Sequence, residues 1–208
     1  MAFAERVHLF MVMPQDDRCV WHRSHNQALG PFRGSKIGRM ATTIRNAAPA
    51  DVPEILSFIR ALAAYEREPD AVSATEAGLL RDGFGANPFY SSLIAEQDGK
   101  PAGFALFFFN YSTWLGRPGL YLEDIFVHPE FRGLGIGKAL LQKVAAIALE
   151  KGCLRLQWEV LDWNTPAIDF YRAMGAEFLD EWRNVRISGD ALQRLAGAET
   201  GKTTGAGS

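Results

Sequence analysis

The residues best suited to chemistry form a glycine-rich turn. Gly133, Gly135 and Gly137 alternate directly after an arginine, between the apolar residues 120–127 and an amphipathic stretch. Glycines let a backbone approach a bound group closely, and the open N–H groups at the start of a helix attract negative charge. An apolar strand, a glycine turn and a helix in this order predict a phosphate-binding site.

The spacing of these glycines narrows the kind of phosphate ligand. A P-loop has four residues between its glycines, whereas Gly133 and Gly137 enclose three. A P-loop also needs a Ser or Thr after its lysine, and Ala139 follows Lys138. A dinucleotide fingerprint ends in G-x-x-G where this chain has Gly135-x-Gly137, so that interpretation is weak as well.

The remaining pattern, Arg132-Gly133-x-Gly135-x-Gly137, resembles the pyrophosphate turn of the GNAT N-acetyltransferase superfamily. Residues 43–194 resemble in particular its diamine acetyltransferases, of the spermidine/spermine and the thialysine type. The shared signatures follow in the same order, at residues 82–90, 111–114, 121–124, 161–164 and 170–171. The resemblance implies an enzyme that uses acetyl-CoA as cosubstrate, without a metal, and acetylates a small cationic amine. It also implies a homodimer.

For acetyl-CoA, the resemblance implies a site built from one strand, the glycine turn and the start of a later helix. Strand backbone would bind the pantetheine, with one N–H polarising the thioester carbonyl, and the turn would wrap the pyrophosphate. The matching positions are Ile125, Phe126, Val127, Arg132, Gly133, Leu134, Gly135, Ile136, Gly137, Lys138, Asn164, Thr165, Pro166, Ala167 and Tyr171. Ile125 and Val127 are also typical of a buried strand. The two interpretations are compatible, because the side chains can pack in the core while the backbone groups bind the pantetheine.

Acyl transfer from a thioester to an amine needs a held donor, a neutral nucleophile and a proton for the leaving thiolate. The resemblance assigns the thiolate's proton to Tyr171, and a phenol with a pKa of about 10 stays protonated at neutral pH. It assigns the proton of the substrate amine to Glu123. Glu123 and Asp124 are adjacent on a strand, so we expect their side chains to face opposite sides of the sheet and to serve different roles.

The resemblance places the amine acceptor against an aromatic and acidic wall, which attracts ammonium groups through cation–π and Coulomb interactions. The matching positions are Tyr65, Glu66, Glu123, Asp124, Gln157, Trp158 and Glu159. Arg67 and residues 68–70 differ from the more acidic stretch of a polyamine enzyme. Residues 111–114 and 161–164 favour the thialysine type.

These sites need elements that hold them in place. Helical spacing predicts helices from about Pro49, over 135–151, and from Asn164 to Gly175. A capping box of Ser73 and Glu76 predicts a further short helix that runs through Leu80. Strands are predicted over residues 42–46, 92–96, 102–111, 120–127, 154–160, 176–180 and 182–187. The order β-α-α-β-β-β-α-β-α-β-β gives an α/β fold with a mixed, mostly antiparallel central sheet flanked by helices. It is also the GNAT order.

Composition limits the function classes. The chain has 208 residues, 48% of them hydrophobic, which is enough for one domain with a substantial core. No apolar run reaches the length of about 18 residues that a membrane span needs, so we expect a cytoplasmic protein without a membrane partner. Residues 40–196 hold 15 basic and 20 acidic side chains, a balance that favours cationic substrates and disfavours nucleic acid.

The two ends of the chain differ from its centre. Residues 1–39 lack periodicity and are interpreted as an atypical N-terminal extension, either disordered or a non-native start before Met40. Residues 40–196 are the expected N-acetyltransferase domain. Residues 197–208, rich in Gly, Thr and Ala, are expected to be a disordered tail.

The cysteines and histidines do not predict a metal site. Cys19, His22 and His25 offer three ligands at a spacing that is not standard for zinc, and no second cluster accompanies them. Cys153 lies beside a predicted strand and is interpreted as a small buried hydrophobic residue.

Two other functions stay open from the residues. One is the same acetyl transfer to an unrelated small amine, such as an amino-acid side chain or an antibiotic amine. The other is a non-catalytic regulator that binds acyl-CoA, which would keep the glycine turn but need no proton donor. Tyr171 together with Glu123 favours an enzyme.

Overall fold

The computed structural model describes residues 41–197, in which five strands form one sheet. Neighbouring strands follow the chain in the order β1-β2-β3-β4-β5. The first three pairings are antiparallel and β4 pairs with β5 in parallel. The bounds are Thr42–Asn46 for β1, Ser91–Gln97 for β2, Lys100–Ser112 for β3, Arg117–Val127 for β4 and Leu156–Gln157 for β5. The mixed, mostly antiparallel sheet of the sequence prediction is confirmed.

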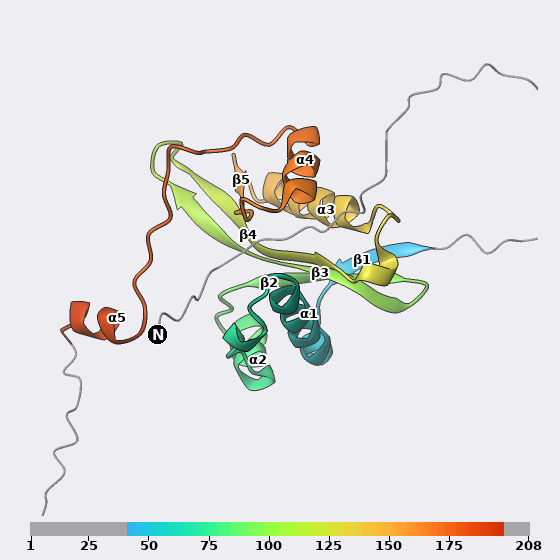
Figure 1. Cartoon of the computed structure of the whole chain (residues 1–208), viewed down its shortest axis with the longest axis horizontal. Coiled ribbons are helices and arrows are strands. Elements are labelled where there is room, and N and C mark those ends of the chain that lie inside the picture. The colour runs from blue at the N-terminus through green and yellow to red at the C-terminus, as the bar shows by residue number, and fades with distance from the viewer. Residues whose placement is uncertain (1–40, 198–208) are drawn as a thin grey trace, which may run out of the picture. The chain divides into compact units, whose positions relative to one another are not determined.

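Helices cover both faces of this sheet. Figure 1 shows α1 and α2 on one face, and α3 with α4 on the other. The α-helices are α1 Val52–Tyr65, α2 Glu76–Phe84, α3 Ile136–Glu150, α4 Thr165–Ala173 and α5 Gly189–Leu195. Short 3-10 helices occupy Pro49–Asp51, Pro69–Ala71 and Pro129–Phe131. None of the helices in residues 41–197 is long and apolar enough to cross a membrane.

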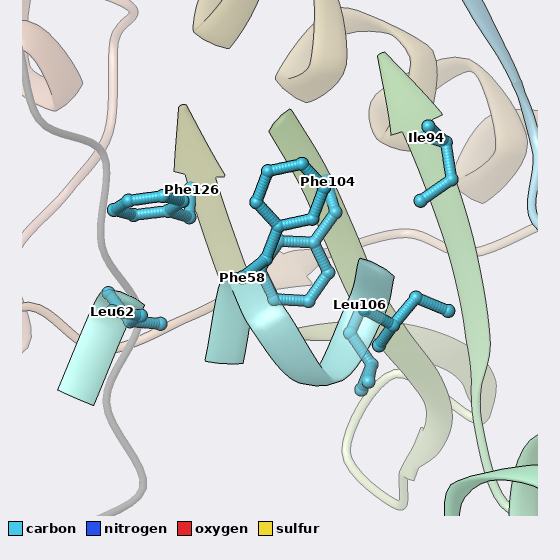
Figure 2. Packing of buried hydrophobic residues seen from close by; sticks show 7 residues of the cluster. Phe58, Leu62, Ile94, Phe104, Leu106 and Phe126 are labelled. Atoms are coloured by element: carbon cyan, nitrogen blue, oxygen red, sulfur yellow. The ribbon is translucent and has the colours of Figure 1, made fainter. Parts of the chain in front are cut away.

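An aromatic core fixes α1 against the strands that carry the site. Phe58 of α1 stacks on Phe104 of β3 with ring centroids 5.4 Å apart, and Phe126 of β4 lies 6.1 Å from Phe58. Figure 2 shows these rings with the surrounding aliphatic side chains. All three rings are almost fully buried, and each such burial stabilises the fold by about 1.5–3 kcal/mol. The end of α1 therefore has a fixed position relative to β4.

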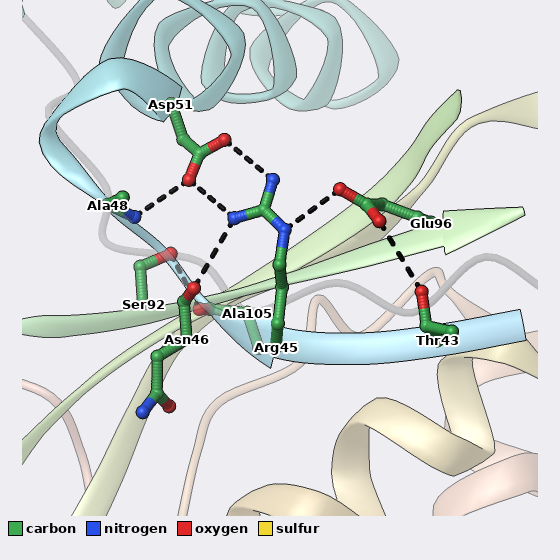
Figure 3. Close-up of polar contacts among 8 residues, drawn as sticks. All are labelled: Thr43, Arg45, Asn46, Ala48, Asp51, Ser92, Glu96 and Ala105. Atoms are coloured by element: carbon green, nitrogen blue, oxygen red, sulfur yellow. Dashed lines mark hydrogen bonds and ion pairs between the residues drawn. The ribbon is translucent and has the colours of Figure 1, made fainter. Parts of the chain in front are cut away.

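A charged network fixes the start of α1. Arg45 of β1 donates to Asp51 at 2.6 and 2.8 Å and to Glu96 of β2 at 2.8 Å (Figure 3). Asp51 also accepts the Ala48 backbone N–H at 2.7 Å. The Arg45 hydrogen bonds lower the pKa of Asp51 below its usual range. The network joins β1, β2 and the turn that leads into α1.

A turn, a helix cap and a buried cysteine agree with the sequence. Asp98 and Gly99 have φ angles of 53° and 77° and join β2 to β3, and an Asp-Gly pair is typical of such a tight hairpin turn. The Asn164 side chain accepts the Ala167 N–H at 3.3 Å and caps α4. Cys153 is buried, with 4% of its surface exposed, as predicted.

Three predictions about elements are wrong in detail. Thr75, not Ser73, caps α2, because α2 begins at Glu76 and the Thr75 hydroxyl accepts the Gly78 N–H at 3.1 Å. The strand predicted over residues 154–160 is reduced to Leu156–Gln157. The strands predicted at 176–180 and 182–187 are not formed, and residues 176–188 have no regular structure before α5. Their alternating apolar pattern favours a strand, but a strand also requires a partner for its backbone hydrogen bonds.

The described chain divides into two compact units after Met174. Residues 41–174 carry the sheet and α1–α4, and residues 175–197 carry α5. The predictions for residues 1–39, including Cys19, His22 and His25, lie outside the described residues, as do those for residues 198–208.

Candidate active site

A β-bulge lies in the middle of β4. Leu106 of β3 pairs with Asp124, and Phe107 pairs with Leu122, so Glu123 is the extra residue on β4. A bulge bends its strand and interrupts the alternation of side chains between the two faces. We predicted that Glu123 and Asp124 face opposite sides of the sheet because side chains alternate along a regular strand. The bulge interrupts this alternation at Glu123. The two carboxyl groups lie close enough for the Glu123 charge to raise the pKa of Asp124.

Five carboxyl groups at and near this bulge interact electrostatically. Burial and Glu159 raise the pKa of Glu123 to about 7. Burial and Glu123 raise the pKa of Asp124 to about 8. Burial, then Asp124 and Glu68, raise the pKa of Glu66 to about 8. Carboxyl groups that titrate near neutral pH can exchange protons with a substrate under cellular conditions.

Tyr121 belongs to the same cluster, although no role in the site was predicted for it from the sequence. Its phenol bonds to Glu159, and burial together with this carboxylate raises the pKa of Tyr121. Its ring stacks on Phe108 at 5.2 Å. Tyr121 precedes Glu123 by two positions, a spacing that could have indicated it. The phenol therefore holds Glu159 beside the bulge.

β4 has an open edge next to the bulge. β5 pairs with β4 only at Leu120 and Tyr121, and within the described residues no strand pairs with that side of β4 from residue 122 onward. Ile125, Phe126 and Val127, the residues expected to bind pantetheine, lie along this stretch. Their side chains are buried in the core, so only backbone groups are available at the edge. An extended ligand could hydrogen-bond there as a strand would.

The glycine turn follows this edge directly. Gly133 and Gly135 have φ angles of 78° and 77°, a left-handed conformation that glycine adopts without strain. Gly135 is the N-cap of α3 and no side chain caps the helix, so the first N–H groups of α3 are open to a ligand. Nothing lies within 4 Å of a Cβ built on Gly135, which leaves room above the turn. The turn thus has the geometry of an anion site.

The other turn residues expected to bind acetyl-CoA differ in their exposure to solvent. Leu134 and Lys138 are exposed beside the glycines, whereas Ile136 and Gly137 are buried in the first turn of α3. Lys138 can therefore reach a bound phosphate, and Ile136 anchors the helix.

Arg132 contacts β4 and the end of α1. Its Nε donates to the Val127 carbonyl at 3.1 Å. The guanidinium lies 5.7 Å from the ring centroid of Tyr65 and 5.9 Å from that of Phe126. Burial lowers the pKa of Arg132. The contact that the resemblance implied, between Arg132 and a pyrophosphate, stays a prediction, and the observed contacts join the turn to α1.

Tyr171 lies on α4, which covers the same face of the sheet as α3 (Figure 1). Its side chain is fully buried, and its ring lies 5.0 Å from Trp158 and 5.5 Å from Phe170. Asn164, the cap of the same helix, is 1% exposed. Asn164 Nδ2 is buried and has no hydrogen-bond partner among residues 41–197. Thr165 and Pro166 begin the helix, and Ala167 is buried beneath it.

The remaining acceptor residues lie at the end of α1 and after β5. Tyr65 and Glu66 end α1, and the Tyr65 ring lies 6.1 Å from Trp163. Gln157 pairs with Tyr121 in the sheet, and Trp158 and Glu159 follow it, all three half-buried. The structure thus brings Glu66, Gln157 and Glu159 close to residues 121–124 of β4. Tyr65 and Trp158 instead contact Trp163 and Tyr171. No group of three or more potential metal ligands occurs in the described part of the chain.

Sequence comparison identifies the family of this arrangement. Residues 55–176 match the Acetyltransferase (GNAT) family. The chain belongs to the GNAT acetyltransferases. A thialysine N-epsilon-acetyltransferase of Bos taurus is 48% identical over 165 residues, which cover 74% of this chain and 96% of that protein. The enzyme class predicted from the sequence, an N-acetyltransferase, is confirmed.

Two further proteins are similar to this chain. A spermidine/spermine N(1)-acetyltransferase-like protein 1 of Homo sapiens is 40% identical over 166 residues, which cover 75% of this chain and 24% of that protein. Among solved structures, an integron cassette protein of V. cholerae superposes with a TM-score of 0.65 at 26% identity, covering 76% of this chain and 99% of that one.

Proposed function

We propose that this GNAT enzyme transfers the acetyl group of acetyl-CoA to a primary amine of a small diamine, polyamine or thialysine/lysine-like molecule. The amine attacks directly in a ternary complex. One observation carries the proposal: the open edge of β4 leads from carboxyl groups with pKa values of about 7 and 8 toward an open anion site at the α3 N-terminus. The thialysine and spermidine/spermine names of two relatives support the choice of acceptor.

The residues present fit acetyl-CoA. The open N–H groups of α3 and Lys138 would hold the pyrophosphate, and the free edge of β4 would hold the pantetheine. The buried Asn164 Nδ2, which lacks a partner in residues 41–197, offers one more donor. Acetyl-CoA supplies the acyl group as a thioester.

Glu123 is the proposed base. A small amine reaches the enzyme as an ammonium ion, and a carboxylate with a pKa of about 7 can accept its proton at neutral pH. The neutral nitrogen then forms a C–N bond with the carbonyl carbon, and the N–H groups near Phe126 and Val127 stabilise the oxyanion. The C–S bond breaks, and Tyr171 donates its proton to the leaving thiolate. The nitrogen then loses its second proton to the Tyr171 phenolate, which regenerates the phenol and leaves the neutral amide.

Thiol release separates this proposal from its alternatives. Spermidine, putrescine, lysine and thialysine would each be assayed with acetyl-CoA and a thiol reagent. We expect release that depends on at least one of these amines. Release with an antibiotic amine alone would favour the unrelated-amine alternative. Tight acetyl-CoA binding without release by any amine would instead identify a non-catalytic regulator.

Homodimerisation, cytoplasmic location and the absence of nucleic-acid and membrane partners remain predictions. Residues 175–197, taken by themselves, support self-association because they expose large apolar side chains, namely Leu179, Trp182, Val185, Ile187, Leu192 and Leu195. Sedimentation velocity would give the expected mass of two chains, and a single-chain mass at micromolar concentration would contradict it.

A further inference from the structure

The end of α1 places a cation on the aromatic wall of the acceptor site. The Arg67 guanidinium carbon lies 5.1 Å from the ring centroid of Trp163. Trp163 in turn contacts Tyr65, a proposed acceptor residue, at 6.1 Å. A face of Trp163 on which a distal ammonium could rest is therefore occupied by the protein's own guanidinium.

The backbone at Arg67 is held in a conformation that suits another residue. Its φ angle is 67°, in the left-handed region. The Glu68 N–H donates to Ala63 O at 2.9 Å and the Arg67 N–H to Ala64 O at 3.2 Å, a closure of α1 in which glycine usually occupies this position. An arginine is strained there, and strained residues of this kind concentrate at ligand sites.

The charges around Arg67 leave its guanidinium available. No ion pair or side-chain hydrogen bond engages it within residues 41–197, and its side chain is exposed. Its sequence neighbours are Glu66, whose pKa of about 8 leaves it largely protonated at neutral pH, and the exposed Glu68. Arg132, whose guanidinium lies over Tyr65, already donates a hydrogen bond to the Val127 carbonyl.

We propose that Arg67 is a specificity-determining residue that binds the carboxylate of an amino-acid acceptor whose distal amine lies at Glu123. A guanidinium placed over an indole ring still has N–H groups at its edge, in its own plane, and these match the two oxygens of a carboxylate. The same charge repels the second ammonium of a diamine. This inference rests on the proposed function and narrows its acceptor to amino acids with a side-chain amine.

Two acceptor pairs isolate the carboxylate. L-Lysine and cadaverine differ only by that group, as do thialysine and bis(2-aminoethyl) sulfide. For wild type we expect kcat/KM to favour the amino acid of each pair. In Arg67→Gln, kcat/KM for lysine should fall about tenfold or more, mainly through KM, while the value for cadaverine rises. Arg67→Lys should keep part of the preference because it keeps the charge.

Arg67→Gly separates recognition from folding, because glycine fits the left-handed backbone at this position. We expect its Tm to equal or exceed that of wild type although the preference for lysine is lost. Arg60→Gln is the matched control, since Arg60 is an exposed arginine on α1 without a ring contact among the described residues. It should leave both acceptors unaffected.

The outcomes distinguish the role of Arg67 from acetyl transfer itself. Equal lysine-to-cadaverine ratios in wild type, Arg67→Gln and Arg67→Gly would overturn the role of Arg67 and leave acetyl transfer standing. A wild-type preference for the diamines would overturn it as well. Absence of thiol release from wild type with every amine would overturn the proposed function.

Discussion

The Arg132 guanidinium lies 5.7 Å from the Tyr65 ring centroid while its Nε donates to the Val127 carbonyl at 3.1 Å. Tyr65 ends α1, where the acceptor is expected, and Val127 ends β4, where acetyl-CoA is expected. One side chain thus joins the proposed donor and acceptor sites.

Arg132→Lys tests this connection. Lysine keeps the charge but loses the planar group that stacks on Tyr65 and its fixed hydrogen-bond geometry. We expect KM for both acetyl-CoA and the amine to rise severalfold, since about 1 kcal/mol of interaction is lost. Steady-state kinetics with each substrate varied in turn would measure it. A change confined to one substrate would show that Arg132 serves only that site.

Glu123 should control the acidic side of the rate profile. Its pKa of about 7 means that the base form accumulates as pH rises through 7, so kcat/KM should increase with pH in this range. Glu123→Gln removes the base and should lower kcat by about a hundredfold or more. It should also lower the pKa of Asp124, because the Glu123 charge contributes to raising it. Rate profiles from pH 5 to 9 would check the change in rate, and an unchanged acidic limb would exclude Glu123 as the base. A carboxyl-carbon NMR titration would measure the pKa of Asp124.

Asp124 should make the fold less stable at high pH. Its folded-state pKa of about 8 lies above the unfolded value of about 3.9, so the folded protein binds more protons between these pH values. The contribution of Asp124 to the free energy of unfolding is therefore fully present below about pH 4, and it declines as pH rises toward 8. Asp124→Asn cannot ionise, and its unfolding free energy should fall less between pH 6 and 8. Urea titrations at both pH values would measure this, and parallel declines in the two proteins would contradict it.

The sequence predicted most of the layers and the open glycine turn, because the relevant information is local. Asp98 and Gly99 by themselves favour the turn that they form, and Asn164 by itself can cap the helix that follows it. Gly133 and Gly135 likewise allow the left-handed backbone at their own positions. The bulge at Glu123 depends on how β3 and β4 align, and the position of Arg132 depends on the packing of α1. Neither can be derived from local spacing. The missing strands at 176–187 show the same limit, since a strand pattern does not supply a partner.

The open turn should be sensitive to a single methyl group at Gly135. Alanine at φ 77° is strained by about 1–2 kcal/mol, although nothing lies within 4 Å of its Cβ. We expect Gly135→Ala to raise KM for acetyl-CoA about tenfold by displacing the N–H groups of α3. Gly116→Ala is the matched control, because Gly116 has a φ of 61°, equally open space, and a position in the β3–β4 turn. Both variants should lose similar stability in thermal melts, and an equal rise of KM in both would contradict a specific role for Gly135.

Tyr171→Phe tests the proton donor with the smallest possible change. The ring is fully buried against Trp158 and Phe170, and phenylalanine preserves these contacts, so the fold should persist. Without the hydroxyl the thiolate must leave unprotonated, and kcat should fall about a hundredfold or more while KM for acetyl-CoA changes little. The alkaline limb of the rate profile should also disappear, since it reports ionisation of the donor. Near-wild-type turnover with an unchanged alkaline limb would assign the proton to another group, and Tyr121, which already bonds to Glu159 beside the bulge, would be the next phenol to replace.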